Sequence, residues 1–368
     1  MTLTLEDTLT LENIIVEGYE RVVKITDDRS GLKAIICIHS LALGPALGGT
    51  RIYPYATFDE ALTDAKRLAK GMTYKSAVTD CGWGGGKSVI IYDSKKPKPK
   101  ELLLAFGEAV NRLKGQYICA EDVGCSPDDV TTISQATPYV VGLLHPKSSG
   151  NPSPFTAWGT FRGMQSVMKK LNGSDSLEGK RVAIQGLGSV GATLAELLFW
   201  AGAKLILCDI DQEKTARIAK AYGGEAVSPN QIMEVPCDIL APCAMGGTLN
   251  PTTIPRLQCK AIAGCANNQL LKDSDADLLK QRGILYAPDF VINAGGLINV
   301  TQELLTEGYN PKISRDKVHS IYDQLMAIYE IAEQNRISTH AAAISLGDYR
   351  LAYGLGRRVI PPCFHHSK

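Results

Sequence analysis

The chain has 368 residues, which is longer than one hydrophobic core usually supports, so two domains are predicted, and its 45% of hydrophobic residues suffice for sizeable cores. Charged residues make up 21% and the formal net charge is +1, which leaves no strong field of either sign to hold nucleic acid or a membrane surface. No apolar run reaches the roughly 18 residues that span a bilayer, and the acidic, polar first residues do not resemble a secretory signal, so we expect a cytoplasmic protein.

Strands and helices are predicted to alternate in the first half of the chain. A helical pattern runs from about 58 to 72, where Thr57 and Glu60 fit a capping box at its start. Another helix is expected after Ser126, because Pro127 suits the first helical position. The short segments rich in β-branched or aromatic residues, which predict strands, are 33–39, 51–53, 88–92 and 117–120.

The second half is predicted to be more regular. Residues 145–155 are dense in Pro, Gly and Ser and are interpreted as a linker or hinge, with a helix over roughly 156–171 after it. Strand-like and helical stretches then alternate, which indicates a parallel sheet with right-handed crossovers, and 313–345 is helical by pattern. The strand-like segments are 181–186, 205–210, 237–242, 261–266 and 284–291.

The ten cysteines do not form any C-x-x-C pair, and several lie in apolar runs such as LILCDI and AIAGCA. Free cysteine packs like a small hydrophobic residue. We therefore expect buried, reduced thiols rather than a zinc site or a disulfide framework, and we predict no metal site.

A glycine-rich motif follows the predicted strand 181–186. Its G-x-G-x-x-G spacing, with a helical pattern directly after it, is typical of a turn that binds a dinucleotide pyrophosphate at a helix N-terminus. Asp209 ends the next strand, where a carboxylate can bind a ribose 2′-OH and repel a 2′-phosphate, so NAD is favoured over NADP. The alternative is a glycine turn that serves packing only. The residues predicted to bind the cofactor here are Gly186, Gly188, Ser189, Val190, Gly191 and Asp209.

Two lysines and one aspartate stand out in the first half. Lys87 follows three glycines directly, Lys75 lies near the end of the predicted helix, and Asp122 follows a strand. Ligands of open α/β sheets bind at the carboxyl ends of strands. A lysine that is desolvated or crowded by another cation can act as a base near neutral pH. On residue type alone, each lysine would more often be a solvated surface charge; the three glycines before Lys87 and the apolar residues around Lys75 favour a functional role.

Uncommon strings cover the chain from about 33 to 300. Together they resemble the Glu/Leu/Phe/Val dehydrogenase superfamily, and most closely the leucine dehydrogenases within it. The strings are GPALGGTR (44–51), RLAKGMTYK (67–75), GGGKSVII (84–91), AEDVG (120–124), GNPSP (150–154), GLGSVG (186–191), APCAMGG (241–247), ANNQL (266–270) and YAPDFVINAGGLINV (286–300).

The resemblance implies an α/β fold with a substrate domain of 1–150, joined by C-terminal helices 331–368, and a Rossmann-type NAD-binding domain of 151–330, with the active site in the cleft between them. It implies NAD-dependent oxidative deamination, in which Lys75 binds the substrate α-carboxylate, Lys87 activates water and Asp122 transfers protons. It further places Gly48 and Gly49 at the substrate, and Thr156, Cys243, Ala244 and Asn267 beside the cofactor, with Asn267 also near the substrate.

The predicted substrate is an apolar L-amino acid. Glutamate dehydrogenases carry a lysine where this chain has Leu47, so a glutamate side chain would be buried without a partner, at a cost of several kcal/mol. Leucine is favoured, but Trp83, Trp158 and Leu297 depart from the usual leucine pattern and leave valine, phenylalanine and tryptophan open. The residues predicted to form the apolar pocket are Leu47, Met72, Leu297 and Val300, although ordinary core packing would explain any one of them.

Two further expectations concern assembly and a competing function. The resemblance implies a homo-oligomer, either an octamer or a dimer. A catalytically silent NAD-binding sensor or scaffold would have the same fold, and turnover distinguishes it from an enzyme. The tail after about 346 has no counterpart in the expected pattern.

Overall fold

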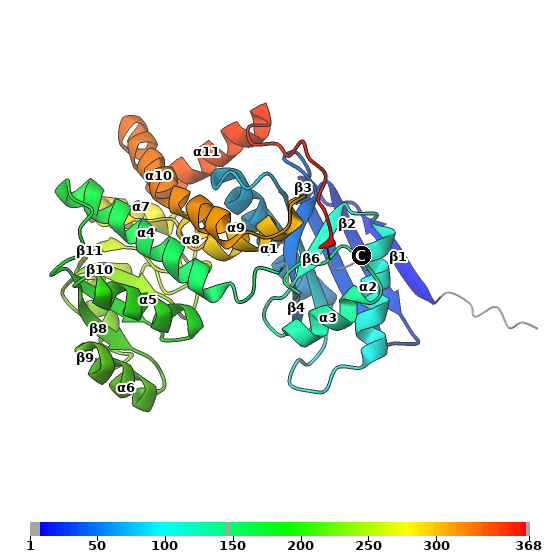
Figure 1. Ribbon diagram of the computed structural model, residues 1–368, viewed down its shortest axis with the longest axis horizontal. Helices are drawn as coiled ribbons and strands as arrows, with labels where there is room; N and C mark the ends of the chain where they lie inside the picture. Colours follow the sequence, from blue (N-terminus) through cyan, green and yellow to red (C-terminus); the bar gives the residue numbers. More distant parts are fainter. Residues whose placement is uncertain (1–7, 144–147, 366–368) are drawn as a thin grey trace, which may run out of the picture. The chain divides into compact units, whose positions relative to one another are not determined.

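The computed structural model describes residues 8–143 and 148–365, and these form two compact units (Figure 1). The first unit contains the described residues up to Gly150 together with Val300–Asn310 and those from Arg350 onward. The second unit contains Asn151–Asn299 and Pro311–Tyr349. We predicted that 331–368 would join the first domain, but 331–349 belong to the second unit. Helix α10 (Pro311–Asn335) packs along α4 (Ser153–Asn172), and beyond its end the Thr339 hydroxyl donates to the Tyr286 carbonyl of the same unit.

The linker prediction for 145–155 is wrong at its end, since α4 already begins at Ser153. Residues 144–147 lie outside the described residues.

The first unit is built on a six-stranded sheet of order β1-β2-β3-β5-β4-β6. The pairs from β1 to β5 are antiparallel, whereas β4 runs parallel to both β5 and β6. Strands β1 and β2 were not predicted, because polar residues interrupt the apolar pattern of both strands. The strands are β1 Leu9–Ile14, β2 Arg21–Asp27, β3 Leu32–Ser40, β4 Ala46–Tyr53, β5 Gly84–Ile91 and β6 Tyr117–Ala120.

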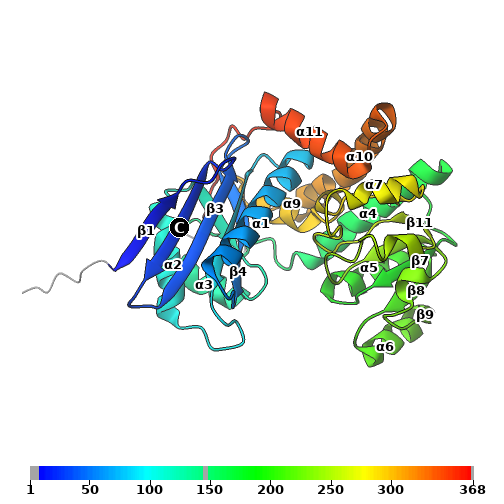
Figure 2. The same ribbon diagram turned by 180° about the vertical axis from the view of Figure 1, so that it is seen from behind.

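Helices cover both faces of this sheet. Helix α1 (Phe58–Val78) lies on one face, and α2 (Lys100–Arg112) and α3 (Pro127–Ser134) lie on the other (Figures 1 and 2). Alternate residues of β3 serve the two faces: Ile35 packs with α1, and Ile36 packs with the α2 side. Both faces of the sheet are therefore buried.

Two helices of this unit, α1 and α3, begin where the sequence predicted. The Thr57 side chain accepts a hydrogen bond from the Glu60 N–H at 3.1 Å, and Ser126 and Asp129 form a capping box at α3. Helix α1 continues six residues beyond the predicted end at 72, so Lys75 lies in its last turn and not after it.

The second unit is a parallel sheet of order β12-β11-β10-β7-β8-β9. Counted from its own first strand, this is the 3-2-1-4-5-6 order of a Rossmann-type fold, with the reversal between β7 and β10. The strands are β7 Arg181–Gln185, β8 Lys204–Cys208, β9 Glu225–Ala226, β10 Cys237–Pro242, β11 Cys259–Ile262 and β12 Leu285–Tyr286. The helices are α4, α5 Ser189–Trp200, α6 Gln212–Tyr222, α7 Asp275–Gln281, α8 Asp289–Ile292, α9 Gly295–Thr301, α10 and α11 Thr339–Tyr353, of which α9 and α11 run into the first unit.

Two strand predictions in this unit extended four or more residues too far. Strand β11 ends at Ile262 rather than at 266. The predicted strand 284–291 is only two residues, because Pro288 cannot donate to a ladder and the short helix α8 starts directly after it. No helix within residues 8–143 and 148–365 has both the length and the apolar character needed to cross a bilayer.

Three cysteines of the first unit behave as small core residues. Cys37 lies in the core under α1, and Cys119 and Cys125 lie in the core under α2 and α3. Burial raises the pKa of Cys37 and of Cys119 to about 12, so these thiols stay protonated at neutral pH and are poor nucleophiles.

Candidate active site

The structure brings Lys87 and Asp122 into direct contact. Lys87 lies within β5, between strands β3 and β4, and only 4% of it is exposed. Asp122 follows the carboxyl end of β6, and its Oδ2 accepts a hydrogen bond from Lys87 Nζ. The two residues are 35 apart in the chain, so the parallel arrangement of β5, β4 and β6 creates this pair.

Gly48 and Gly49 make the room that the pair requires. A Cβ on Gly48 would lie 1.8 Å from the Gly86 carbonyl oxygen, and one on Gly49 would lie 2.8 Å from Asp122 Cβ. Any side chain at these two positions would push β4 away from β5 or displace Asp122. Gly48 and Gly49 thus lie next to the Lys87–Asp122 pair. The close contacts within the sheet by themselves require glycine at both positions, whether or not a substrate binds there.

Arg51 and Asp64 complete a chain of charges that sequence reasoning missed. Arg51 Nε donates to Asp122 Oδ1 at 3.1 Å, and its Nη1 donates to Asp64 Oδ2 at 2.9 Å. Tyr55 Oη donates to the same Asp64 oxygen at 2.5 Å. Arg51 ends the string GPALGGTR. A charged residue within a predicted strand could have marked Arg51 as a candidate site residue.

The environment keeps Asp122 ionised. Burial by itself raises the pKa of Asp122, but the charges of Lys87 and Arg51 and the hydrogen bonds outweigh it, so its pKa is lowered. Its neighbour Glu121 shows the opposite result: burial, and then the charge of Asp122, raise the pKa of Glu121. Asp122 is therefore an ionised acceptor beside the buried Lys87 at neutral pH.

Lys75 lies on the part of α1 that packs against the start of β5. Ser76 Oγ donates to the Trp83 carbonyl at 2.7 Å, and a Cβ on Gly85 would lie 2.0 Å from Thr73 Oγ1. The residues on either side of Lys75 thus hold the last turns of α1 against the strand that carries Lys87. Lys75 itself is half-buried.

The four predicted apolar pocket residues are distributed over both units. Leu47 is 2% exposed on β4, Met72 is half-buried on α1, and Val300 is half-buried beside Gly142, all within the first unit. Leu297 is buried on α9 and belongs to the second unit. Leu47 lies between Gly85 of β5 and Ile118 of β6.

In the second unit the glycine motif forms a tight turn from β7 into α5. Gly186 has a φ of 100°, which favours glycine, and its N–H donates to the Cys208 carbonyl at 2.7 Å. Gly188 is the N-cap of α5, and the helix begins with Ser189 and Val190. A Cβ on Gly191 would lie 2.0 Å from the Gly186 carbonyl oxygen, whereas one on Gly188 would meet nothing within 4 Å.

Asp209 is tied to this turn. Its Oδ2 accepts from the Leu187 N–H at 2.6 Å and its Oδ1 from the Asp211 N–H at 3.0 Å. Burial raises the pKa of Asp209, but these backbone donors outweigh it and lower the pKa overall. Asp209 is thus a charged residue held at the glycine turn by backbone hydrogen bonds.

The other predicted cofactor residues are placed as follows. The structure brings Cys243 and Ala244 against the glycine turn: the Cys243 N–H donates to the Gln185 carbonyl at 2.7 Å, and Ala244 Cβ lies 2.6 Å from where a Cβ on Gly186 would be. Thr156 lies in the first turn of α4, where its hydroxyl donates to the Pro152 carbonyl. Asn267 is exposed, and its Oδ1 accepts from Asn293 Nδ2 at 2.7 Å.

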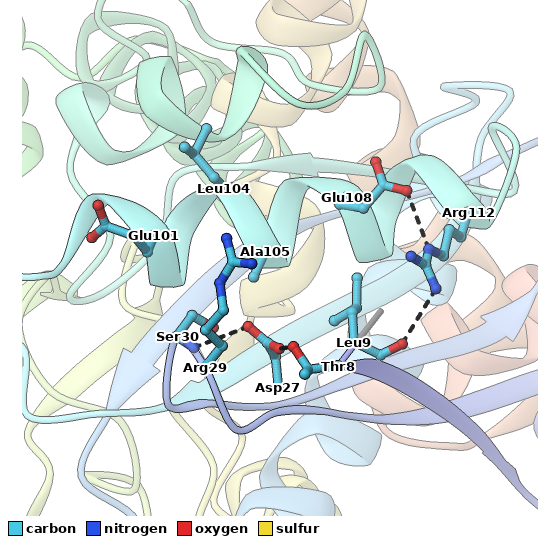
Figure 3. A pocket seen from close by; sticks show the side chains of 10 residues that line it. All are labelled: Thr8, Leu9, Asp27, Arg29, Ser30, Glu101, Leu104, Ala105, Glu108 and Arg112. Atoms are coloured by element: carbon cyan, nitrogen blue, oxygen red, sulfur yellow. Dashed lines mark hydrogen bonds and ion pairs between the residues drawn. The ribbon is translucent and has the colours of Figure 1, made fainter. Parts of the chain in front are cut away.

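A cavity of about 410 Å³ lies elsewhere in the first unit, between α2 and the start of β1 (Figure 3). None of its lining residues is a predicted site residue. Its polar groups bond to each other: Asp27 accepts from Thr8 and from the Ser30 N–H, and Arg112 donates to Glu108. We therefore do not place the active site there.

The C-terminal tail, which the sequence left without an account, packs on the first unit. The Arg358 N–H donates to the Leu43 carbonyl at 2.8 Å, and the Arg358 guanidinium lies 3.9 Å from the centre of the Trp83 ring. Phe364 contacts Tyr139 edge-on, with 5.4 Å between ring centres. The tail thus covers the segment that leads into β5.

The strand order of the second unit and the glycine turn at its point of reversal define a two-domain α/β protein with a Rossmann-type domain. Comparison with family models agrees with this class. Residues 19–139 match the Glu/Leu/Phe/Val dehydrogenase dimerisation domain, and residues 151–211 and 206–353 match the Glutamate/Leucine/Phenylalanine/Valine dehydrogenase domain. The chain belongs to the Glu/Leu/Phe/Val dehydrogenase family, and it is an amino-acid dehydrogenase.

Curated relatives of this chain differ in the amino acid that their names give. It is 50% identical to leucine dehydrogenase of Geobacillus stearothermophilus, over 90% of both chains. It is 44% identical to L-tryptophan dehydrogenase of Nostoc punctiforme, over 93% of this chain and 96% of that one. The crystal structure of the tryptophan enzyme from Nostoc punctiforme matches with a TM-score of 0.82 at 43% identity, covering 92% of this chain and 97% of that one.

Proposed function

We propose that this protein catalyses the reversible NAD-dependent oxidative deamination of an apolar L-amino acid, with L-leucine as the preferred substrate, to the 2-oxo acid and ammonia. The observation that carries the proposal is the contact between the buried Lys87 of β5 and Asp122, which follows the carboxyl end of the parallel strand β6, in a chain of the amino-acid dehydrogenase family. Such a pair supplies a cation and a proton acceptor in one place, as amine oxidation requires.

The second unit fits NAD. The open space around Gly188 at the start of α5 leaves the backbone free to approach a pyrophosphate, and the helix N-terminus offers N–H donors. Asp209 accepts one backbone hydrogen bond on each oxygen, so further lone pairs remain for a ribose hydroxyl, while its charge disfavours a 2′-phosphate. When bound, the nicotinamide supplies the acceptor for the hydride that leaves the substrate Cα.

In the first unit, the proposed roles divide among three side chains. Lys75 binds the substrate α-carboxylate, and its position beside the start of β5 keeps that contact near Lys87. Lys87 activates the water that adds to the imine carbon of the oxidised substrate. Asp122, in contact with Lys87, receives the proton and returns one to the leaving amine. Gly48 and Gly49 lie against Gly86 and Asp122, beside this pair, and we assign them to the wall of the substrate site.

Leu47 supports an apolar substrate side chain. It is 2% exposed, and its neighbours in the sheet are Gly85 and Ile118, so the backbone positions next to it present no charged side chain to a buried carboxylate. A glutamate side chain placed there would cost several kcal/mol. The likeness to an L-tryptophan dehydrogenase at 44% identity makes tryptophan the second candidate substrate.

A substrate panel with a lysine variant tests the proposal. The purified protein with NAD should produce NADH from L-leucine at alkaline pH, and valine, isoleucine, phenylalanine and tryptophan should be compared under the same conditions. Lys87→Ala should lower turnover by about 10²- to 10⁴-fold while NAD binding, measured by calorimetry, persists. Lys96→Ala is the matched control, because Lys96 is an exposed lysine of the same unit.

Absence of NADH from every apolar L-amino acid would refute the proposed function. If NAD still bound in that case, a silent sensor or scaffold would be the better description. We also propose a homo-oligomer, an octamer or a dimer, supported by the dimerisation-domain description of the matching family model. Light scattering on the purified protein distinguishes these from a monomer.

A further inference from the structure

We propose that Arg51 is a positioning residue for Asp122: by binding one oxygen of the Asp122 carboxylate and anchoring itself on Asp64, it keeps the other oxygen directed at Lys87. This inference rests on the proposed function only in that Asp122 has a role in deamination. Its geometry stands on hydrogen bonds within the first unit.

The two oxygens of Asp122 have different partners. Oδ1 accepts from Arg51 Nε at 3.1 Å and from the Val123 N–H at 2.8 Å, whereas Oδ2 accepts from Lys87 Nζ. With Oδ1 occupied by two donors, rotation of the carboxylate would break two charge-assisted hydrogen bonds at once. Oδ2 is therefore the oxygen that faces the lysine.

Arg51 is itself held from the opposite side. Its Nη1 bonds Asp64 Oδ2 at 2.9 Å, and Tyr55 donates to that same oxygen. The side chains of Arg51 and Asp64 are about three-quarters buried, with 23% and 27% exposed. The planar fork of arginine can serve two carboxylates in fixed directions, which a lysine ammonium on a flexible stem cannot do in the same way.

The anchor links Asp122 to the helix that carries Lys75. Asp64 belongs to α1, Arg51 to β4 and Lys87 to β5, and Asp122 follows β6. The chain of hydrogen bonds from Tyr55 through Asp64 and Arg51 thus joins the framework of the first unit to the carboxylate. Loss of Arg51 would leave Asp122 held by Lys87 and by one backbone N–H.

The charges around Asp122 set the direction of the expected effect. Lys87 and Arg51 are the cations that face it, Glu121 is the neighbouring acid, and Asp64 lies behind Arg51. The other titratable groups near it, Tyr117 and Cys125, are buried, and burial raises the pKa of both, so they stay neutral. Removal of the Arg51 charge therefore raises the pKa of Asp122, because only Lys87 and the Val123 N–H remain to oppose burial and Glu121.

The experiment compares Arg51→Met, Arg51→Lys and Asp64→Asn, with Arg112→Met as the matched control. Arg112 forms a more exposed arginine–carboxylate pair on α2 in the same unit. The first measurement is the carboxyl titration of Asp122 by carbon NMR, assigned by its loss in Asp122→Asn, and it needs no substrate. The second is the pH profile of kcat and of kcat/KM for the best substrate.

In Arg51→Met the midpoint of the Asp122 titration should rise by about one pH unit, and the acid limb of kcat should move with it. In Arg51→Lys the rise should be smaller because charge is restored without the fork, and in Asp64→Asn smaller still. KM for the amino acid should stay within about twofold, since Arg51 has no proposed contact with the substrate. The control should leave both measurements unchanged.

An Asp122 titration that is the same in the wild type, Arg51→Met and Asp64→Asn would overturn the inference. If Arg51→Met does not fold, Arg51→Lys and Asp64→Asn carry the same test, with circular dichroism to confirm their folding. Failure of the proposed function is a separate result: the wild type would then show no turnover with any apolar amino acid, while the NMR titration would still report on Arg51.

Discussion

The glycine turn of the second unit offers a pair of substitutions that separate folding from cofactor binding. In Gly191→Ala the new Cβ would lie 2.0 Å from the Gly186 carbonyl oxygen, whereas ordinary contacts begin at 3.4 Å. The turn and α5 must therefore separate by about 1.4 Å. Overpacking of this kind costs about 1–3 kcal/mol, which corresponds to a fall in the unfolding midpoint of roughly 2–12 °C for a unit of this size.

Gly188→Ala is the matched variant. Its Cβ would meet nothing within 4 Å, and a φ of −62° is open to any residue, so the unfolding midpoint should stay unchanged. The Cβ would instead occupy the space through which a pyrophosphate approaches the backbone. Loss of one hydrogen bond to a charged group would weaken NAD binding by about 10- to 100-fold.

Thermal unfolding by circular dichroism and NAD titration by calorimetry give both values for each variant. Gly191→Ala should lose stability and affinity together, and Gly188→Ala should lose affinity alone. A Gly188→Ala protein that binds NAD as tightly as the wild type would remove the turn from the cofactor site. A Gly191→Ala protein with unchanged stability would show that the close approach of Gly191 to Gly186 is not a packing constraint.

Two further predictions concern the first unit. Arg358→Ala should lower the free energy of unfolding, measured by urea titration, by about 1–2 kcal/mol, because the guanidinium stacks on Trp83 at 3.9 Å. The control Arg357→Ala, at an exposed neighbouring position, should have little effect. Equal effects of the two substitutions would contradict the packing of the tail. The second concerns pH. Burial raises the pKa of Asp122, but Lys87 and Arg51 lower it overall, so the stability that it contributes is complete above about pH 4 and is lost as the pH falls through its folded-state pKa. The difference in unfolding free energy between the wild type and Asp122→Asn should therefore shrink as the pH falls. Urea titrations at a series of pH values measure this difference. A difference that stays constant or grows would contradict the predicted lowering of the Asp122 pKa.

Local pattern predicted much of the fold. The capping residues Thr57 and Ser126 begin helices where expected, and the glycine turn after β7 opens α5. These features depend on neighbouring residues only, so a single sequence displays them. The strands β1 and β2 and the short β12 were missed or misjudged, because partial exposure and a proline disturb the pattern that marks a strand.

In the candidate site, too, the sequence predicted some residues and only tertiary contacts revealed the others. Lys87 and Asp122 stood out by residue type and position in the sequence, and a tertiary contact joins them. Arg51 and Asp64 did not stand out, because an arginine in a strand and an aspartate in a helix have many ordinary explanations. Their partnership exists only after β4, β6 and α1 have come together.

The sequence by itself determined that the chain is an α/β protein with a dinucleotide-type glycine turn, since turn geometry and helix starts are encoded over a few residues. It also carried, through its strings of shared residues, the relation to the amino-acid dehydrogenases. Only the tertiary structure decided which charges meet, where the C-terminal tail lies, and that Leu297 and Val300 belong to different units. Contacts between residues far apart in the chain depend on the order and direction of strands in a sheet, and no local pattern specifies that order.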